Sequence, residues 1–373
     1  MRICTRCLLD ETVPEIRFDQ KGECNFCKVY DVLADQFPLD GREDYNLQQL
    51  VKKIKRDGKG KKYDCILGVS GGTDSSYTMY KAVELGLRPL AVHLDNGWDS
   101  DIAVKNIKYT CERLGVDLYT YVIDWEEFKN LQLSFLKASV PDFEIPTDVA
   151  IHATLVKSAA KEKVKYVLNG HSFRTEFVMP KGWTYMDGKY IKSVQKKFGN
   201  RSLKSYPNFT LWDVVYFNMI RGIKVVPFLN YFQYEKALAK EVLKEKIGWI
   251  DYGGHHEESI YTKFFMTYML PVKFNIDKRK TEYSARVLSN KMKREDALAV
   301  IEHPVPYSEE NVDYVIRKLG IDKAEFNEIL QLPVKSFHDY PTYYPLMKAF
   351  RAPIKLACNL GILPSLLYYK FLD

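Results

Sequence analysis

The stretch Val69-Ser70-Gly71-Gly72-Thr73-Asp74-Ser75-Ser76 decides the fold that we expect for this chain. It follows an apolar run, 63–69, that predicts a strand, and it opens a helical run, 75–85, that Gly86 closes. Two adjacent glycines allow positive φ and a close backbone approach to a ligand. The amides of such a loop and the N-terminus of the next helix bind anions. The segment therefore predicts a strand–loop–helix unit that holds a phosphate group.

Short apolar runs and helical runs keep alternating up to about residue 255. Further strands are expected at 90–95, 118–123, 166–168 and 223–226. A helix is expected at 101–114, where Gly115 closes it, and another after Asp124, which caps it. A third helix is expected from Thr147 or Asp148, as its cap, to about Lys161. This alternation predicts an α/β fold with a doubly wound parallel sheet of about five strands and helices on both faces. The expected domains are 1–35, 60–255 and a mostly helical 256–373, which contains an amphipathic helix at 260–270.

Length and composition exclude several classes of protein. The chain has 373 residues, 46% hydrophobic and 28% charged, which excludes a disordered or fibrous chain as a whole. It contains no apolar run of about 18 residues and no signal-peptide core at its start, so we expect neither membrane insertion nor export, and a cytoplasmic location. The net charge of +7 suits a phosphate-bearing ligand.

Four of the seven cysteines form two pairs of one spacing, Cys4-x2-Cys7 and Cys24-x2-Cys27. In a reducing compartment this spacing predicts a metal site instead of disulfides. Four thiolates suit a structural Zn²⁺ with no open position for water, and Gly22 suits the turn before the second pair. An iron–sulfur cluster is the alternative occupant.

Hydroxyl groups and one acid complete the predicted phosphate site. Ser70, Thr73, Ser75 and Ser76 offer hydroxyl donors, whereas Asp74 would repel a bare phosphate and is therefore expected to hold Mg²⁺. Ligands of open α/β sheets bind beyond the carboxyl ends of the strands. The candidates at those ends are His93, Asp95, Gly170, His171 and, just beyond them, Arg174.

Two later segments carry more chemistry. The block Trp249-Ile250-Asp251-Tyr252-Gly253-Gly254-His255-His256-Glu257-Glu258-Ser259 is dense in polar groups, and 273–294 has eight basic against two acidic side chains. We expect part of this region to fold over the phosphate loop, with Lys273, Lys278 and Arg279 holding pyrophosphate or a sugar-linked diphosphate. The alternative is a solvated basic surface.

Together these motifs resemble known families. The loop S-G-G-T-D-S is similar to that of the ATP pyrophosphatase (PP-loop) superfamily, which implies an adenine nucleotide alpha hydrolase-like fold and cleavage of ATP into AMP and pyrophosphate. Four cysteines, this loop, N-G-H at 169–171, W-I-D-Y-G-G-H-H-E-E-S and K-F-x-x-D-K-R resemble the N-acetyl sugar amidotransferase family of bacterial lipopolysaccharide, O-antigen or flagellin-glycan synthesis. The resemblance covers about residues 1–350.

Each candidate residue has an expected role. Asp74, Asp95, Lys273 and Arg279 would be catalytic. ATP would be bound by Ser70, Gly71, Gly72, Thr73, Asp74, Ser75, Ser76, His93 and Gly170. The sugar substrate, expected to be nucleotide-linked, would be bound by His171, Arg174, His256, Glu257 and Lys278.

The expected reaction turns an N-acetyl group into an acetamidino group through an O-adenylyl intermediate. Residue 2 is Arg2, and Cys65, Cys111 and Cys358 lie in no nucleophile elbow, so ammonia should come from a separate glutaminase, with a cyclase-like subunit as channel. The alternatives are a tRNA sulfur transferase, which the basic runs at 52–62 and 189–204 keep open, and a non-catalytic ATP sensor. Nucleic acid is otherwise not expected as a partner.

Overall fold

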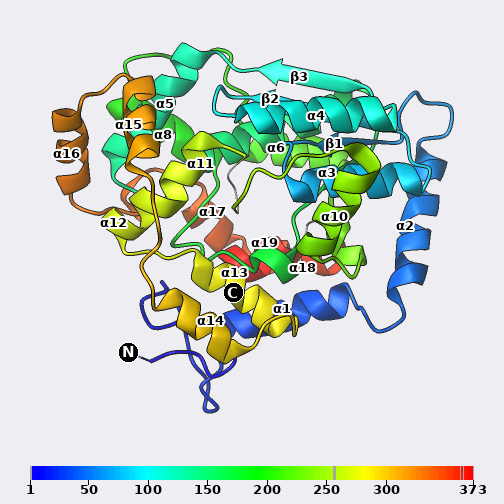
Figure 1. Cartoon of the computed structure of the whole chain (residues 1–373), viewed down its shortest axis with the longest axis horizontal. Coiled ribbons are helices and arrows are strands. Elements are labelled where there is room, and N and C mark those ends of the chain that lie inside the picture. Colours follow the sequence, from blue (N-terminus) through cyan, green and yellow to red (C-terminus); the bar gives the residue numbers. More distant parts are fainter. Residues whose placement is uncertain (1, 255–257, 362, 364, 373) are drawn as a thin grey trace.

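A parallel β-sheet lies at the centre of the computed structural model, which describes residues 2–254, 258–361, 363 and 365–372 (Figure 1). The strand order in the described chain is β3-β2-β1-β4-β5, and all four pairings are parallel. The strands are β1 (Cys65–Gly68), β2 (Pro89–Asp95), β3 (Leu118–Val122), β4 (Tyr166–Asn169) and β5 (Lys224–Pro227). The predicted doubly wound parallel sheet is confirmed.

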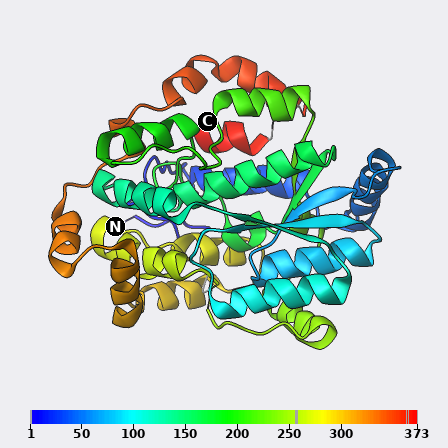
Figure 2. The same ribbon diagram turned by 90° about the horizontal axis from the view of Figure 1, so that it is seen from above.

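Helices cover both faces of this sheet, as Figure 2 shows. Side chains alternate along β1, so Cys65 and Leu67 pack in a cluster with α2 (Glu43–Asp57), α3 (Thr73–Glu84) and α4 (Asp101–Leu114). Ile66 points the other way and packs in a cluster with α6 (Ile145–Lys161). Because both faces are covered, β1 and most of β2 are buried and read as continuous apolar runs.

The strand order reverses between β1 and β4, its neighbour in the sheet. Their carboxyl ends, Gly68 and Asn169, open onto the loops that lead into α3 and α7 (Phe173–Glu176). In open α/β sheets a crevice for ligands forms at this reversal, because the two loops leave in opposite directions. The topology therefore places the site where the glycine loop leaves β1.

Most predicted helix boundaries agree with the structure. Gly115 ends α4 in the left-handed region, and Asp124 caps α5 (Trp125–Ala138) by accepting a hydrogen bond from the Glu127 amide. The prediction that Thr147 or Asp148 caps the next helix is wrong. This helix, α6, begins at Ile145, because the fixed φ of Pro146 suits a first helical turn.

The remaining helices lie outside these layers, and α10 among them packs on α3 and α4. They are α1 (Asn25–Gln36), α8 (Gly188–Phe198), α9 (Leu211–Asp213), α10 (Lys236–Ile247), α11 (Ile260–Phe264), α12 (Leu270–Phe274), α13 (Arg279–Leu288), α14 (Arg294–Ile301), α15 (Glu309–Leu319), α16 (Lys323–Gln331), α17 (Tyr344–Ala349), α18 (Arg351–Asn359) and α19 (Ser365–Phe371). Shorter turns are η1 (Val214–Ile220), η2 (Phe228–Tyr231), η3 (Phe265–Met269) and η4 (Phe337–Asp339). Through η3, α11 and α12 form one helical run, as the amphipathic pattern predicts. Within the described ranges, no helix is both long and apolar enough to cross a bilayer.

Candidate functional site

The glycine loop turns sharply between β1 and α3. Gly71 has φ +75°, and a Cβ there would lie 2.2 Å from the Ala103 carbonyl oxygen, so only glycine fits. Gly72 has φ −72° and is the N-cap of α3, so the positive φ expected of the glycine pair occurs at Gly71 alone. The turn aims the first amides of α3 at the open end of the sheet, which is the arrangement that binds anions.

Hydroxyl groups gather on this loop. The Ser70 amide donates to Ser75 Oγ at 3.2 Å, and Ser75 Oγ donates to the Gly72 carbonyl oxygen, also at 3.2 Å. The Thr73 hydroxyl is buried and has no hydrogen-bond partner in the described structure. Ser76 is buried at the start of α3. Because a buried, unpaired hydroxyl costs free energy, Thr73 is suited to a polar ligand at the loop.

The segment 249–252 lies against the loop from the side of α4. Trp249 Nε1 donates to the Gly71 carbonyl oxygen at 3.0 Å, and the Asn106 side chain of α4 donates to the same oxygen at 3.2 Å. Asn106 also exchanges hydrogen bonds with the backbone of Ile250, at 2.8 Å in each direction. The Thr73 amide donates to the Tyr252 hydroxyl at 3.2 Å. Part of the polar block therefore does fold over the phosphate loop.

Asp74 faces α10 and not open solvent. Its carboxylate accepts a short hydrogen bond from the Tyr234 hydroxyl and lies 3.3 Å from Lys236 Nζ. Burial works to lower the pKa of Lys236, but the charge of Asp74 prevails and the pKa lies above its ordinary value. A bound phosphate group would compete with Asp74 for this ammonium group.

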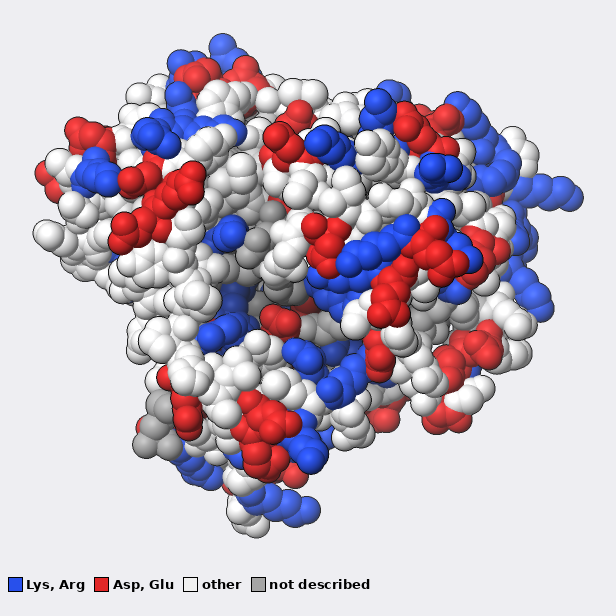
Figure 3. All heavy atoms as spheres, in the orientation of Figure 1, with Lys and Arg blue, Asp and Glu red and all other residues white. Residues whose placement is uncertain are grey.

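A cavity of about 800 Å³ opens beside the loop, and Figure 3 shows the face of the molecule hollowed near its middle, with charges of both signs around the hollow. Its volume suits a ligand of nucleotide-sugar size. One wall comes from the carboxyl ends of β1, β2 and β4, including Ser70, His93 and Asn169. The side-chain oxygen Oδ1 of Asn169 is buried and has no hydrogen-bond partner among the described residues. Segments from α6, α11, α13 and 305–308 form the opposite walls.

His93 lies between two hydrogen-bond acceptors on the strand side of this cavity. Its Nδ1 lies 3.0 Å from the Val69 carbonyl oxygen and its Nε2 lies 3.2 Å from the Asp99 carboxylate. Both partners accept hydrogen bonds, so both ring nitrogens must donate, as they do in imidazolium. Burial works to lower the pKa of His93, but Asp99 raises it above its ordinary value.

Two further cations lie on the α13 side. Lys278 and Arg279 both line the cavity. The Arg279 guanidinium donates three hydrogen bonds to the Asp277 carboxylate, the shortest at 2.8 Å, and one to the His303 carbonyl oxygen at 2.6 Å. Burial lowers the pKa of Lys278. The cavity is therefore lined by basic side chains from β2 and from the start of α13.

Two predicted site residues lie elsewhere and need correction. Lys273 Nζ donates to the carbonyl oxygens of Ile329, Leu330 and Leu332, each at 2.8 Å, so it caps α16 and does not hold phosphate. Arg174 is buried and donates to the backbone carbonyl oxygens of Phe37 and Asn230, so it joins segments of the chain and does not reach substrate. In both cases the helix-end or loop carbonyls needed a donor, which the sequence alone does not show.

Other predicted residues lie near the cavity without lining it. Asp95 accepts a hydrogen bond from the Gly97 amide at 2.9 Å and so shapes the turn after β2. A Cβ at Gly170 would lie 2.8 Å from the Asp74 carbonyl carbon, so glycine lets the β4 loop approach α3. His171 pairs with Glu176, which lines the cavity. His256 and Glu257 lie outside the described residues.

The predictions missed three residues that the structure brings to the loop or the cavity: Asp99, Tyr252 and Glu258. Glu258 Oε1 would lie 3.3 Å from a Cβ at Gly72, and both Glu258 and Asp99 line the cavity. The isolated bridge between Asp99 and Ser259 explains this placement, because it joins the two loops. Tyr252 and Glu258 lie in the polar block, whose density was the available signal.

One comparison with known proteins covers the part of the chain that forms the second half of this cavity. Residues 258–352 match the family model described as "LPS biosynthesis protein WbpG-like, C-terminal domain". This part of the chain is therefore similar to a WbpG-like C-terminal domain, and it is called the WbpG-like domain below. The match confirms the resemblance to a polysaccharide-biosynthesis family that the sequence motifs indicate.

Other comparisons cover less or are more distant. Over 64 residues the chain is 39% identical to tRNA(Ile)-lysidine synthase from Chlamydia pneumoniae, which is 17% of this chain and only 20% of that protein. Among solved structures, U34-tRNA thiolase NcsA from Methanococcus maripaludis is 12% identical (81% of this chain, 89% of that chain, TM-score 0.34). NH3-dependent NAD synthetase from Campylobacter jejuni is 13% identical (71% and 99%, TM-score 0.33). At these TM-scores the likenesses carry no information on activity.

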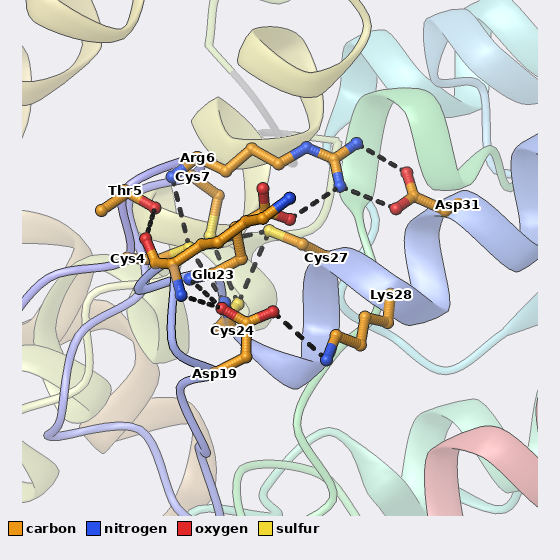
Figure 4. A network of polar contacts seen from close by, with 11 residues as sticks. Cys4, Thr5, Arg6, Cys7, Asp19, Glu23, Cys24, Cys27, Lys28 and Asp31 are labelled. Atoms are coloured by element: carbon orange, nitrogen blue, oxygen red, sulfur yellow. Dashed lines mark hydrogen bonds and ion pairs between the residues drawn. The ribbon is translucent and has the colours of Figure 1, made fainter.

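The four N-terminal cysteines converge beneath the WbpG-like domain (Figure 4). Their sulfur atoms lie within 4.8 Å of one another, with contacts of 3.8 Å between Cys4 and Cys27 and 3.6 Å between Cys7 and Cys24. Four thiolates at about 2.3 Å from one tetrahedral ion would be about 3.8 Å apart. The donor set therefore fits a single metal ion. A four-iron cluster fits less well, because each thiolate binds a different iron and the sulfurs stand farther apart.

The cysteine segment is attached to α13 and α14 of the WbpG-like domain. Arg294 donates to the carbonyl oxygens of Cys4 at 2.7 Å and Cys7 at 3.1 Å. Lys280 pairs with the buried Asp10 carboxylate at 2.6 Å. Because α13 also presents Arg279 to the cavity, the cysteine segment supports one cavity wall.

Proposed function

We propose that the protein is an ATP-dependent amidotransferase that converts the N-acetyl group of a nucleotide-linked sugar into an acetamidino group. One observation carries the proposal: Ser70 and Ser75 of the glycine loop line the same cavity as Lys278 and Arg279 of the WbpG-like domain. The loop suits the phosphates of ATP. The opposite wall, with Lys278 and Arg279, suits the diphosphate of a second substrate.

The proposed chemistry activates a poor electrophile. The acetamide oxygen attacks the α-phosphorus of ATP, pyrophosphate leaves, and the amide nitrogen loses its proton, which gives an O-adenylyl imidate. Ammonia then attacks the imidate carbon, and AMP leaves with the former acetamide oxygen. The products are the acetamidine, AMP and pyrophosphate, so one NH group replaces one oxygen.

The residues of the loop have distinct roles in this proposal. The amides of Gly72 and Thr73, with the Thr73 hydroxyl, would hold the phosphates and stabilise the charge that develops on pyrophosphate. Lys236 would move from Asp74 to the phosphates, which frees Asp74 to hold Mg²⁺. A bound Mg²⁺ would neutralise phosphate charge. The four N-terminal thiolates would hold a structural Zn²⁺, with no part in the reaction.

The nitrogen would come from a separate glutaminase. Among the described cavity-lining residues there is no cysteine, and Cys65 and Cys111 are buried in the core of the sheet domain. The same observation weighs against a tRNA sulfur transferase, which would need a thiol near the reacting atoms.

A product assay tests the proposal. Protein, ATP, Mg²⁺ and an ammonium salt are mixed with nucleotide-linked N-acetyl sugars, and mass spectrometry follows the exchange of one oxygen for one NH group. Asp74→Asn should abolish ATP–pyrophosphate exchange. The control Asp117→Asn changes an exposed carboxylate just before β3, and it should leave the exchange unchanged. Formation of ADP, or unchanged exchange in Asp74→Asn, would contradict the proposed reaction.

A further inference from the structure

The helices α17 and α18 present an unusual surface. Leu346, Phe350, Leu356 and Leu360 are 44%, 54%, 59% and 66% exposed. Leu346 and Phe350 are four residues apart, as are Leu356 and Leu360, so each pair lies on one side of its helix. Exposed apolar side chains are common singly, but a row of four on consecutive helices is not.

The opposite side of these helices is packed. Cys358 of α18 is buried in a cluster with Tyr368 and Leu372, against which Met347 and Ile354 also pack. Arg351 Nε donates to the Tyr368 hydroxyl at 3.2 Å. The two helices are therefore held on the protein by one face, and the row Leu346–Leu360 is their outer face.

The charged side chains of these two helices have one sign. Residues 340–361 contain Lys348, Arg351 and Lys355 and no acidic residue. All three basic side chains are exposed, but the charged groups of Arg351 and Lys355 lean toward the packed side, 5.6 Å and 5.1 Å from the centroid of the Tyr368 ring, so these two residues flank the apolar row. Exposed lysines among exposed leucines can place their ammonium groups at a charged boundary while their stems cover apolar surface.

A second exposed apolar segment lies close by. In α9 and η1, Trp212 is 77% and Ile220 is 70% exposed. Figure 2 shows this segment and α17–α18 along the same edge of the molecule. Burial, and then the charges of Asp187 and Asp213, raise the pKa of Tyr343, so α9 and the start of α17 lie within electrostatic range. None of these apolar residues lines the central cavity.

We propose that α17 and α18, with the neighbouring Trp212 and Ile220, form a docking surface for a bilayer that carries anionic headgroups. Helices that lie in the membrane interface have this composition, with leucine, phenylalanine and tryptophan on one face and lysines and arginines beside them. The surface is the outer side of two helices and not a groove, which suits a flat, fluid partner. Each basic side chain near an anionic surface strengthens binding about fivefold.

Co-sedimentation with vesicles tests this docking surface. The full chain should sediment with vesicles of equal parts phosphatidylglycerol and phosphatidylcholine, less so at high salt, and not with pure phosphatidylcholine. Lys348→Gln/Lys355→Gln should weaken binding about 25-fold, which is two factors of about five. Leu356→Ser/Leu360→Ser should abolish it. Leu238→Ser, which changes a 56% exposed leucine on α10, is the matched control and should bind as the parent chain does.

Several results would overturn the docking surface. Absence of sedimentation with anionic vesicles would do so, as would equal loss in the Leu238→Ser control. If the parent chain instead self-associates without lipid in analytical ultracentrifugation, and Leu356→Ser/Leu360→Ser prevents this, the surface joins two copies of the chain. Thermal melting shows whether each variant is folded. The outcome is independent of the proposed amidotransferase reaction, since none of these residues lines the cavity.

Discussion

The ion pair between Asp10 and Lys280 gives a direct test of how the cysteine segment is held on α13. Asp10 is only 1% exposed, and its carboxylate accepts hydrogen bonds from Lys280 Nζ at 2.6 Å and from the Thr12 amide at 3.0 Å. Lys280→Met keeps most of the apolar stem but leaves this carboxylate without its counter-ion. Breaking a buried pair costs about 3–5 kcal/mol. Because the Thr12 hydrogen bonds remain, we expect the lower end, about 3 kcal/mol, or roughly a hundredfold in the unfolding equilibrium constant.

The pH dependence of this pair has a definite sign. Burial works to raise the pKa of Asp10, but Lys280 and Thr12 prevail and hold it below the ordinary value of 3.8. The pair therefore stabilises the protein fully above pH 3.8, and this contribution is lost as the pH falls through the lowered pKa. In Lys280→Met burial acts with less opposition and the folded-state pKa of Asp10 rises, so the loss of stability on acidification should be smaller than in the parent chain.

Urea unfolding and thiol reactivity together measure the effect. Lys280→Met should lower the unfolding midpoint and make the four cysteines react faster with a thiol reagent. Asp10→Asn/Lys280→Met should recover part of the loss, because no unpaired charge remains. Lys293→Met, at an exposed lysine just before α14, is the matched control. If Lys280→Met and Lys293→Met unfold alike and expose thiols alike, the attachment of the cysteine segment through this pair is refuted.

Three further predictions follow from other contacts. Gly71→Ala should lower nucleotide affinity in calorimetry at least tenfold, because its Cβ would lie 2.2 Å from the Ala103 carbonyl oxygen; unchanged affinity would show that the loop binds no phosphate. Lys273→Met should lower the free energy of unfolding by about 1–3 kcal/mol through lost hydrogen bonds and leave pyrophosphate exchange intact, which separates a cap from a catalytic group. The pKa of His93 lies above 6.5, so the pairing of His93 with Asp99 stabilises the fold fully below pH 6.5. This stabilisation is lost as the pH rises through the elevated pKa. Asp99→Asn should lower this pKa in an NMR titration; an unchanged titration would disprove the pairing.

The local features of the site could be predicted from the sequence. The strand before Val69, the glycine loop and the helix after it follow from periodicity and from the conformational freedom of glycine. The two cysteine pairs predicted a metal site because thiols two residues apart share one turn. Ser70 and Ser75 were correctly assigned to the loop, since their positions depend on only a few backbone angles.

Long-range pairings could not be predicted in this way. Lys273 and Arg174 were assigned to phosphates and substrate, yet each satisfies carbonyl groups more than fifty residues away along the chain. A lysine that caps a helix and a lysine that binds phosphate have the same sequence signal, namely a basic residue near polar neighbours. Only the neighbours in space distinguish them.

The sequence by itself determined the parallel α/β sheet, the glycine turn and the cysteine cluster, because each depends on residues close together in the chain or on a period repeated along it. The tertiary structure alone decided that Tyr252 and Glu258 lie over the loop, that His93 pairs with Asp99, and that α13 joins the cysteine segment to the cavity. These contacts join residues that are distant in sequence. Their energies depend on burial and on the competition for hydrogen-bond partners, which exist only once the chain has folded.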